Sequence, residues 1–345
     1  MRITLAVNSD LLPDKVGGRT KRIKEELKKR GHNVKVIHRS SSLIHKFRAL
    51  FHNFWKIYVN PNYSPTEKLN AKFDKIVCKK LKPCEVLHCW DYLPNTLARA
   101  KSLGITTVID IQMAPVGNYM TNPMIDYVLC PSEFARESCL KIGIKENKLI
   151  NVPFGADLLK FYPGEKWDKK FTVLFVGSVC ERKGVSNLLR AWEYFIERHP
   201  AEVQLLLAGR AFKGFKKQIK HYKFAGHIGF LKYKSLLSEY QKANVLVLPS
   251  SEEGSAKVTY ESLASGLPVL CTFESGSLVH NGVGRIIKQD YESILNGLEF
   301  IFDLWKNQRN VYNDFCRESR ELMKTNTWDV YKKEVVDVYE KVSSY

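Results

Sequence analysis

Two glutamates, Glu253 and Glu261, are the residues of this sequence best suited to act on a ligand. They stand eight positions apart among small and polar residues. The apolar run ANVLVLPS (243–250) precedes them and is typical of a buried strand, and a short helical pattern closed by Gly266 follows before the strand-like PVLCT. In a doubly wound fold, strand, loop and helix in this order present a ligand site at the carboxyl end of the sheet. The stretch 250–270 is therefore the first candidate site.

The residues between these glutamates extend the candidate site. Gly254, Ser255, Ala256 and Lys257 run into the predicted helix. The free amides of a helix N-terminus suit a phosphate group. Taken alone, Glu261 has a structural alternative, because a carboxylate near a helix N-terminus also complements the helix dipole.

A glycine and a basic turn form a second set of candidates. The strand-like run FTVLFVGS ends at Gly177, where backbone without a side chain can approach a ligand closely. Arg182 and Lys183 follow on the next turn, and Gly184 opens a helix. Such cations can bind a diphosphate by charge-assisted hydrogen bonds, although a lone turn lysine is more often simply solvated.

The first half of the chain offers weaker signals. Gly17 and Gly18 lie in a polar loop between a predicted strand (2–8) and a predicted helix, where they form either an anion cradle or a plain tight turn. His88 ends a predicted strand and is either a ligand-side residue or a hydrogen-bonded core histidine. Asp91 follows it and has the alternative of capping the next segment.

The order of elements predicts the fold class. Strand-like and helix-like runs alternate through both halves of the 345-residue chain, which predicts α/β domains with parallel sheets and helices on both faces. We expect two Rossmann-like doubly wound domains facing each other across a cleft. The expected boundaries are 1–160 for the first domain, 161–325 for the second, and 326–345 for a last helix that packs back on the first.

The net charge of +18 indicates an anionic partner. Residues 1–60 hold fourteen Lys or Arg against four Asp or Glu. No helix-turn-helix, zinc-finger or RNA-binding signature accompanies this charge, so nucleic acid is not the expected partner.

Residues 43–58 have the clearest helical periodicity, with aromatic and aliphatic side chains on one face and basic ones on the other. Two interpretations stay open: a helix packed on its own domain, or a basic aromatic helix lying on an anionic membrane surface.

Other classes of protein are excluded by composition. No apolar run reaches eighteen residues, and the N-terminus lacks signal-peptide features. We therefore expect a cytoplasmic protein, with peripheral attachment to the inner face of the membrane as an option. The eight cysteines form no CxxC pair, so neither structural zinc nor a disulfide framework is expected.

Five motifs together resemble the family 4 glycosyltransferases (glycosyl transferases group 1), which are retaining enzymes of the GT-B architecture. The resemblance covers nearly the whole chain, and the last motif, with two glutamates and a G-PV ending, is the most specific. The motifs are GGRTKRIKEELKKRGHNVKVI (17–37), EVLHCWD (85–91), CPSEFARESCLKIGIKENKLINVPFGADLLKFYP (130–163), FVGSVCERKG (175–184) and EEGSAKVTYESLASGLPV (252–269).

The resemblance implies a role for each matching residue. Glu253 corresponds to the acidic residue near the transferred sugar and is the catalytic candidate. Glu261 corresponds to the residue that binds the nucleotide ribose, and Lys183 to the lysine that binds the diphosphate. Gly17 and Gly18 correspond to the loop near the phosphates.

Three departures from the family pattern concern the same site. The usual arginine after FVG is Ser178 here, and Arg182 is a possible replacement. Ser255, Ala256 and Lys257 stand where the family usually has an aromatic residue and a glycine. The histidine that the family often places near the sugar aligns with Asp110 or Gln112.

The resemblance implies a retaining transferase that moves a sugar from a nucleotide-sugar donor to a saccharide or lipid-linked acceptor in glycan biosynthesis, without a metal or other cofactor. Two alternatives are a non-catalytic GT-B subunit that binds nucleotide sugars and a sugar epimerase or phosphorylase on the same fold.

Overall fold

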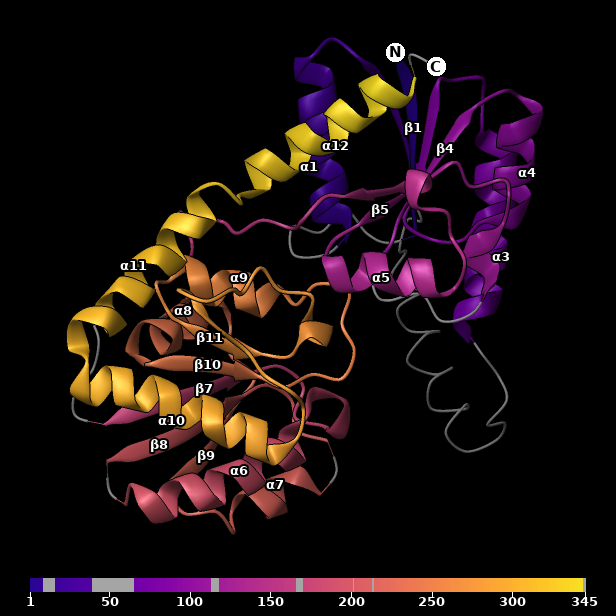
Figure 1. Ribbon diagram of the computed structural model, residues 1–345. Coiled ribbons are helices and arrows are strands. Elements are labelled where there is room, and N and C mark those ends of the chain that lie inside the picture. Colours follow the sequence, from indigo (N-terminus) through magenta and orange to yellow (C-terminus); the bar gives the residue numbers. More distant parts are fainter. Residues whose placement is uncertain are drawn as a thin grey trace. The chain divides into compact units, whose positions relative to one another are not determined.

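The computed structural model divides into two compact units, which we describe separately (Figure 1). The N-terminal unit comprises Met1–Cys130, Arg136–Val152 and Tyr331–Tyr345, and the C-terminal unit comprises Pro131–Ala135 and Pro153–Val330. The residues that the structure describes are 1–8, 16–38, 65–112, 118–165, 170–200, 202–212 and 214–343. The predicted helix at 43–58 lies outside the described residues.

The N-terminal unit is built on a six-stranded parallel sheet with the order β2-β1-β3-β4-β5-β6. Its strands are β1 (Arg2–Val7), β2 (Asn33–His38), β3 (Val86–Cys89), β4 (Thr106–Asp110), β5 (Tyr127–Cys130) and β6 (Leu149–Asn151). Its helices include α1 (Val16–Lys29), α3 (Pro65–Lys80), α4 (Pro94–Ser102) and α5 (Glu133–Lys141), whose first residues belong to the other unit. The strand order reverses between β1 and β3.

The glycine pair occupies a different position from the one expected. Gly17 and Gly18 lie in the first turn of α1 and not in the loop before it, because the helix begins at Val16. A glycine in the first turn leaves its amide free of intrahelical bonding, since the first N–H groups of a helix have no acceptor within it. The amides therefore remain suited to an anion from this position.

The C-terminal unit repeats the plan with the strand order β12-β11-β10-β7-β8-β9, again parallel throughout. Its strands are β7 (Phe171–Val176), β8 (Val203–Ala208), β9 (Ala225–Gly229), β10 (Val245–Leu248), β11 (Val269–Cys271) and β12 (Gly284–Ile286). Its helices are α6 (Val185–Arg198), α7 (Phe215–Ile219), α8 (Tyr233–Lys242), α9 (Lys257–Ala264), α10 (Tyr291–Asn307) and α11 (Arg309–Lys324). Here the order reverses between β7 and β10.

The central strands of the C-terminal unit are apolar because both faces of the sheet are covered by helices. Every residue of β7 and of β10 is buried. Helix α6 contributes one apolar stripe, of which Leu188, Leu189 and Trp192 are fully buried. A continuous apolar run is what a strand buried on two faces requires. The prediction of two doubly wound, Rossmann-like parallel sheets is confirmed.

The last helix, α12 (Trp328–Val342), belongs mainly to the N-terminal unit. Its buried side chains there are Tyr331, Val335, Val336, Tyr339 and Val342. None of the helices that the structure describes is long and apolar enough to cross a bilayer.

Candidate functional site

The carboxyl edge of the C-terminal sheet gathers most of the predicted site residues. β7 leads directly into Gly177, and β10 leads through Pro249 into the acidic loop. These two strands are neighbours, and the strand order reverses between them. Ligands of doubly wound folds bind outside such a reversal, at the carboxyl ends of the strands. Gly177 itself has φ +152°, a conformation that side-chain-bearing residues rarely adopt.

Gly184 fixes the position of the basic turn. It has φ +69°, and a Cβ atom at this position would stand 2.1 Å from the carbonyl oxygen of Pro249. The turn Glu181–Lys183 therefore packs directly on the end of β10. The amide of Ser251 donates to the Arg182 carbonyl at 2.9 Å, which joins the turn to the acidic loop.

Lys183 and Arg182 both contact the carboxylate of Glu253. The Lys183 Nζ atom lies 2.5 Å from Glu253 Oε1, and the Arg182 Nη1 atom lies 2.7 Å from the same oxygen. The Lys183 and Glu253 side chains are 11% and 16% exposed, whereas that of Arg182 is 42% exposed. The sequence predicts these residues for one site, and the structure brings them into a single charged cluster.

The acidic loop is held by hydrogen bonds to the segment after β11. The Glu253 amide donates to the Glu274 carbonyl at 2.9 Å, and the Ala256 amide donates to the Ser275 carbonyl at 3.0 Å. The Ser132 hydroxyl donates to the Gly254 carbonyl at 2.5 Å. These hydrogen bonds hold the loop in place, as a preformed site requires.

Helix α9 begins where the sequence predicts, with Lys257 as its first residue and Ala256 as its N-cap. No side chain caps it. Its first amides are therefore among the groups that an anion can accept from.

Glu261 and Ser255 both contact buried tyrosines. The Tyr240 hydroxyl donates to Glu261 Oε2 at 3.0 Å, and the Ser255 hydroxyl donates to the Tyr260 oxygen at 2.8 Å. Burial, and next the charge of Glu261, raise the pKa of Tyr240 well above 10, so this hydroxyl stays protonated and donates. The tyrosine orients the carboxylate to which the family resemblance gives a role in binding the ribose.

Lys257, the unusual cation of the motif, contacts an aromatic ring. Its Nζ atom lies 5.9 Å from the centroid of the Trp328 ring. This is the range of a cation–π interaction. The lysine therefore has a packing role as well as its predicted role in donor binding.

In the N-terminal unit, His88 is a core residue. It is fully buried, and its Nδ1 atom lies 2.5 Å from the Tyr339 hydroxyl. Burial, and next the charge of Arg19, lower the pKa of His88 to about 3, so the ring is neutral and Nδ1 accepts from the tyrosine. Of the two interpretations of His88, this geometry supports a hydrogen-bonded core histidine.

Asp110 is buried beside it and receives several donors. The Trp90 Nε1 atom donates at 2.9 Å, the Tyr331 hydroxyl at 3.0 Å, and the Arg19 Nη1 atom lies 3.4 Å from both carboxylate oxygens. Burial nevertheless raises the pKa of the Asp110 carboxyl group. With 2% of its surface exposed, Asp110 is shielded from solvent by these neighbours. Asp91 is half-buried and Gln112 is exposed, so these two reach solvent at the carboxyl edge of the sheet.

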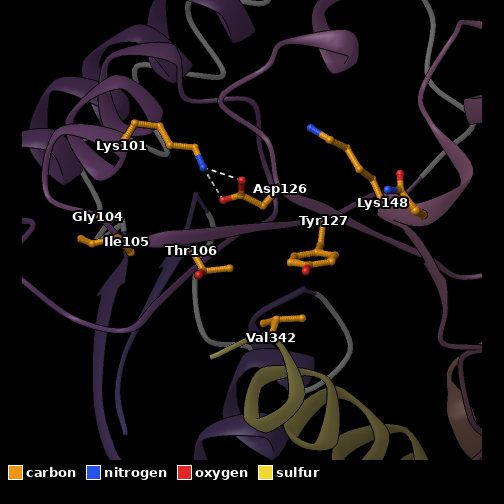
Figure 2. A pocket seen from close by; sticks show the side chains of 9 residues that line it. Lys101, Gly104, Ile105, Thr106, Asp126, Tyr127, Lys148 and Val342 are labelled. Atoms are coloured by element: carbon orange, nitrogen blue, oxygen red, sulfur yellow. Dashed lines mark hydrogen bonds and ion pairs between the residues drawn. The ribbon is translucent and has the colours of Figure 1, made fainter. Parts of the chain in front are cut away.

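A hollow of about 420 Å³ lies at the other edge of the N-terminal sheet, where β4 and β5 begin (Figure 2). Its two lysines already have protein partners. Figure 2 shows Lys101 directed at the Asp126 carboxylate, with which it forms an ion pair, and Lys148 donates to the Ile125 carbonyl at 2.5 Å. None of the predicted site residues lines this hollow.

Several residues that shape the two regions were not predicted from the sequence. They are Tyr240, Tyr260 and Ser132 around the acidic loop, and Arg19, Trp90, Tyr331 and Tyr339 around Asp110. Each is distant in sequence from its partner or forms part of an ordinary helical pattern, and the two tyrosines of α12 differ from other core residues only in carrying a hydroxyl. Among the described residues, no group of three His, Cys, Asp or Glu side chains could hold a metal ion.

Comparison with known proteins agrees with this arrangement. The model of the family described as Glycosyl transferases group 1 matches residues 161–315. An uncharacterized glycosyltransferase of Methanocaldococcus jannaschii is 25% identical over 225 residues, which cover 59% of this chain and 56% of the relative. The chain thus spans about half the length of the curated relatives it matches.

Solved structures of other proteins superpose on nearly the whole chain. A glycosyltransferase from Rickettsia africae superposes with a TM-score of 0.74 at 14% identity, covering 99% of this chain and 98% of the other. HepE from Anabaena, solved in complex with UDP-glucose, superposes with a TM-score of 0.68 at 13% identity, covering 99% of this chain and 100% of the other.

The C-terminal unit therefore matches the glycosyl transferases group 1 family over residues 161–315, and the chain has the GT-B fold. The family resemblance inferred from the five motifs is confirmed.

Proposed function

We propose that this protein is a glycosyltransferase that moves a sugar from a nucleoside-diphosphate-sugar donor to a saccharide or lipid-linked acceptor, with retention of anomeric configuration. One observation carries the proposal: Lys183, Arg182 and Glu253 form a charged cluster at the strand-order reversal of the C-terminal sheet. The group 1 family match is to this same unit.

Donor binding would give Lys183 and Arg182 a new partner in place of Glu253. A diphosphate beside Lys183 and Arg182 would take over the cations that now contact Glu253, and the uncapped start of α9 would supply backbone amides. Arg182 would replace the cation that the family has where this chain has Ser178, because its guanidinium already lies in the cluster. The structure of HepE with UDP-glucose makes uridine diphosphate sugars the first donors to test.

In the reaction, the bond between the anomeric carbon and the diphosphate oxygen breaks, and its electron pair leaves with the diphosphate. An acceptor hydroxyl forms the new bond on the same face of the sugar, and its proton passes to the oxygen of the leaving diphosphate. Lys183, Arg182 and the α9 amides would stabilise the charge that grows on the leaving diphosphate, which is the main electrostatic demand of the transition state. Glu253, released from these cations, would lie near the transferred sugar. Glu261, oriented by Tyr240, would accept hydrogen bonds from the ribose hydroxyls.

These protein charges supply what a divalent ion supplies elsewhere, so we propose that transfer proceeds without a metal cofactor. The basic aromatic segment 43–58 is proposed to hold the protein at the inner face of the membrane, where a lipid-linked acceptor in glycan biosynthesis would lie.

A thermal-shift panel of nucleoside diphosphates and their sugars tests the proposal, because a bound donor raises the unfolding temperature by mass action. We expect one nucleotide class to stabilise the protein, and the matching sugar donor to release nucleoside diphosphate in the presence of EDTA and an acceptor. Absence of any shift would contradict the proposal. A shift without turnover on any acceptor would favour the non-catalytic subunit.

A further inference from the structure

The loop and helix between β8 and β9 carry an unusual concentration of positive charge. From Arg210 to Phe224 the sequence has six Lys or Arg residues and no Asp or Glu. Helix α7 packs on the edge strand β9, and it is anchored by the buried side chains of Phe215 and Ile219. We call these exposed residues on and directly after this helix the α7 surface: Lys216, Lys217, Lys220, Lys223 and Phe224.

The lysines of the α7 surface are not balanced by carboxylates. Lys216, Lys217, Lys220 and Lys223 form no ion pair within the described part of the chain, in contrast to Lys242 and Lys306 of the same unit. Lysines beside an edge strand also protect it against pairing with another chain, so charge alone does not require a partner.

The phenylalanine of this surface requires a further explanation. Phe224 is 48% exposed. Phe224 is also the one residue other than glycine with a positive φ, +53°, among those that the structure describes. A side chain in this conformation is strained, and glycine adopts it freely. The chain therefore holds an exposed apolar ring, with the ammonium of Lys170 5.1 Å from its centroid, at a position that favours glycine.

We propose that the α7 surface is a docking surface for an anionic lipid membrane. Phenylalanine has no polar group to satisfy, so its ring is stabilised in the interface of a bilayer, while the surrounding lysines are attracted by acidic headgroups. This arrangement complements a membrane in charge and in polarity. It lies in the C-terminal unit and is separate from segment 43–58, and the inference holds whether or not the protein transfers a sugar.

The test is co-sedimentation of the full chain with vesicles of phosphatidylglycerol and phosphatidylcholine, compared with vesicles of phosphatidylcholine alone. We expect binding to the acidic vesicles only, and weakening as salt is raised. Each lysine near such a surface contributes roughly fivefold to the partition coefficient, so the triple change Lys216→Glu, Lys217→Glu, Lys220→Glu should lower it on the order of 100-fold or more. The matched control changes Lys288, Lys333 and Lys341 to Glu, which alters the net charge equally at other exposed lysines, and it should bind nearly as the parent does.

Phe224→Gly separates docking from folding. Glycine relieves the positive φ, so this variant should unfold at the same temperature as the parent or a higher one, yet bind acidic vesicles roughly tenfold more weakly. Vesicle binding that survives both the triple variant and Phe224→Gly would overturn the proposal and place the contact elsewhere, for example at 43–58. Equal losses in the triple variant and its control would overturn it as well, since net charge alone would then explain binding. A parent chain that ignores acidic vesicles but binds single-stranded oligothymidylate through these lysines would identify nucleic acid as the partner instead.

Discussion

Lys183 and Glu253 form a short ion pair, with 2.5 Å between Nζ and Oε1, although the sequence assigns the lysine to a diphosphate and the glutamate to a sugar. Both side chains are largely shielded from solvent. Each is the other's counter-charge, which avoids the cost of an unpaired charge in a shielded place. Under the proposed function, a donor diphosphate would therefore replace Glu253 as the anion beside Lys183.

The two cations of the cluster should differ in their effect on donor binding. Lys183→Met should weaken binding of the stabilising nucleoside diphosphate roughly tenfold to 100-fold, because a shielded charged hydrogen bond is lost. Arg182→Met should weaken it by less than about fivefold, since the more exposed guanidinium is screened by water. Isothermal titration calorimetry of both variants measures the difference. If both variants lose the same affinity for the nucleotide, solvent exposure does not determine how much each cation contributes to binding.

Glu253→Gln should separate binding from turnover. We expect turnover to fall on the order of 100-fold or more, as for loss of a catalytic carboxylate, while diphosphate affinity is kept or rises because a competing anion is gone. The neighbouring change Glu252→Gln alters net charge equally and serves as the control. Unchanged turnover in Glu253→Gln would remove this residue from the mechanism.

The ribose assignment of Glu261 can be tested with a nucleotide analogue. Glu261→Ala should weaken binding of the nucleoside diphosphate roughly tenfold or more, and should leave binding of its 2′,3′-dideoxy analogue nearly unchanged. Tyr240→Phe should produce a smaller loss, because it removes only the hydroxyl that orients the carboxylate. If the natural nucleotide and its analogue lose affinity equally, Glu261 does not contact the ribose.

Gly184→Ala should destabilise the C-terminal unit by about 2–5 kcal/mol, through its positive φ and a clash with the Pro249 carbonyl oxygen. Gly229 has a similar φ, +75°, but open space where a Cβ would stand. Gly229→Ala should therefore cost only about 1–2 kcal/mol. Urea unfolding of the two variants gives the comparison. A cost for Gly184→Ala no larger than for Gly229→Ala would show that the turn can move away from β10.

His88 should make the N-terminal unit sensitive to acid. Its folded-state pKa of about 3 lies below the usual 6.5, so the unfolded chain takes up a proton first as the pH falls. The contribution of the neutral His88 ring to the free energy of unfolding is fully present above pH 6.5. It is lost as the pH falls toward 3, at up to about 1.4 kcal/mol per pH unit. His88→Asn keeps an acceptor for Tyr339 and removes the titration. The difference in unfolding free energy between parent and variant should accordingly shrink between pH 6 and pH 4, and a constant difference would refute the assignment.

The parts of the fold that depend on local pattern could be predicted from the sequence. The sequence predicted several elements near their observed positions: the apolar strands β7 and β10, the amphipathic helix α6 and the start of α9. A strand buried on both faces shows a continuous apolar run, and a helix buried on one face shows a helical repeat of apolar residues. The start of α1 was misjudged, since two glycines disguise a helical first turn. The contacts of Lys183 and Arg182 with Glu253 and the hydroxyl bonds of Tyr240 and Tyr339 were not predictable. They depend on which side chains meet across the fold, and periodicity does not contain that information.

The path of the chain between its two units has a consequence for protein engineering. The chain leaves the N-terminal unit after Cys130 and after Val152, and the N-terminal unit also includes residues from Tyr331 onward. Ser132, whose hydroxyl holds the acidic loop, belongs to the short excursion Pro131–Ala135. A chimaera that grafts a new donor specificity by joining two parents at a single crossover near residue 153 would therefore combine a foreign Ser132 segment and a foreign last helix with the wrong partners. Recombination of this protein needs crossovers at both ends of residues 153–330, with position 132 matched to the grafted loop.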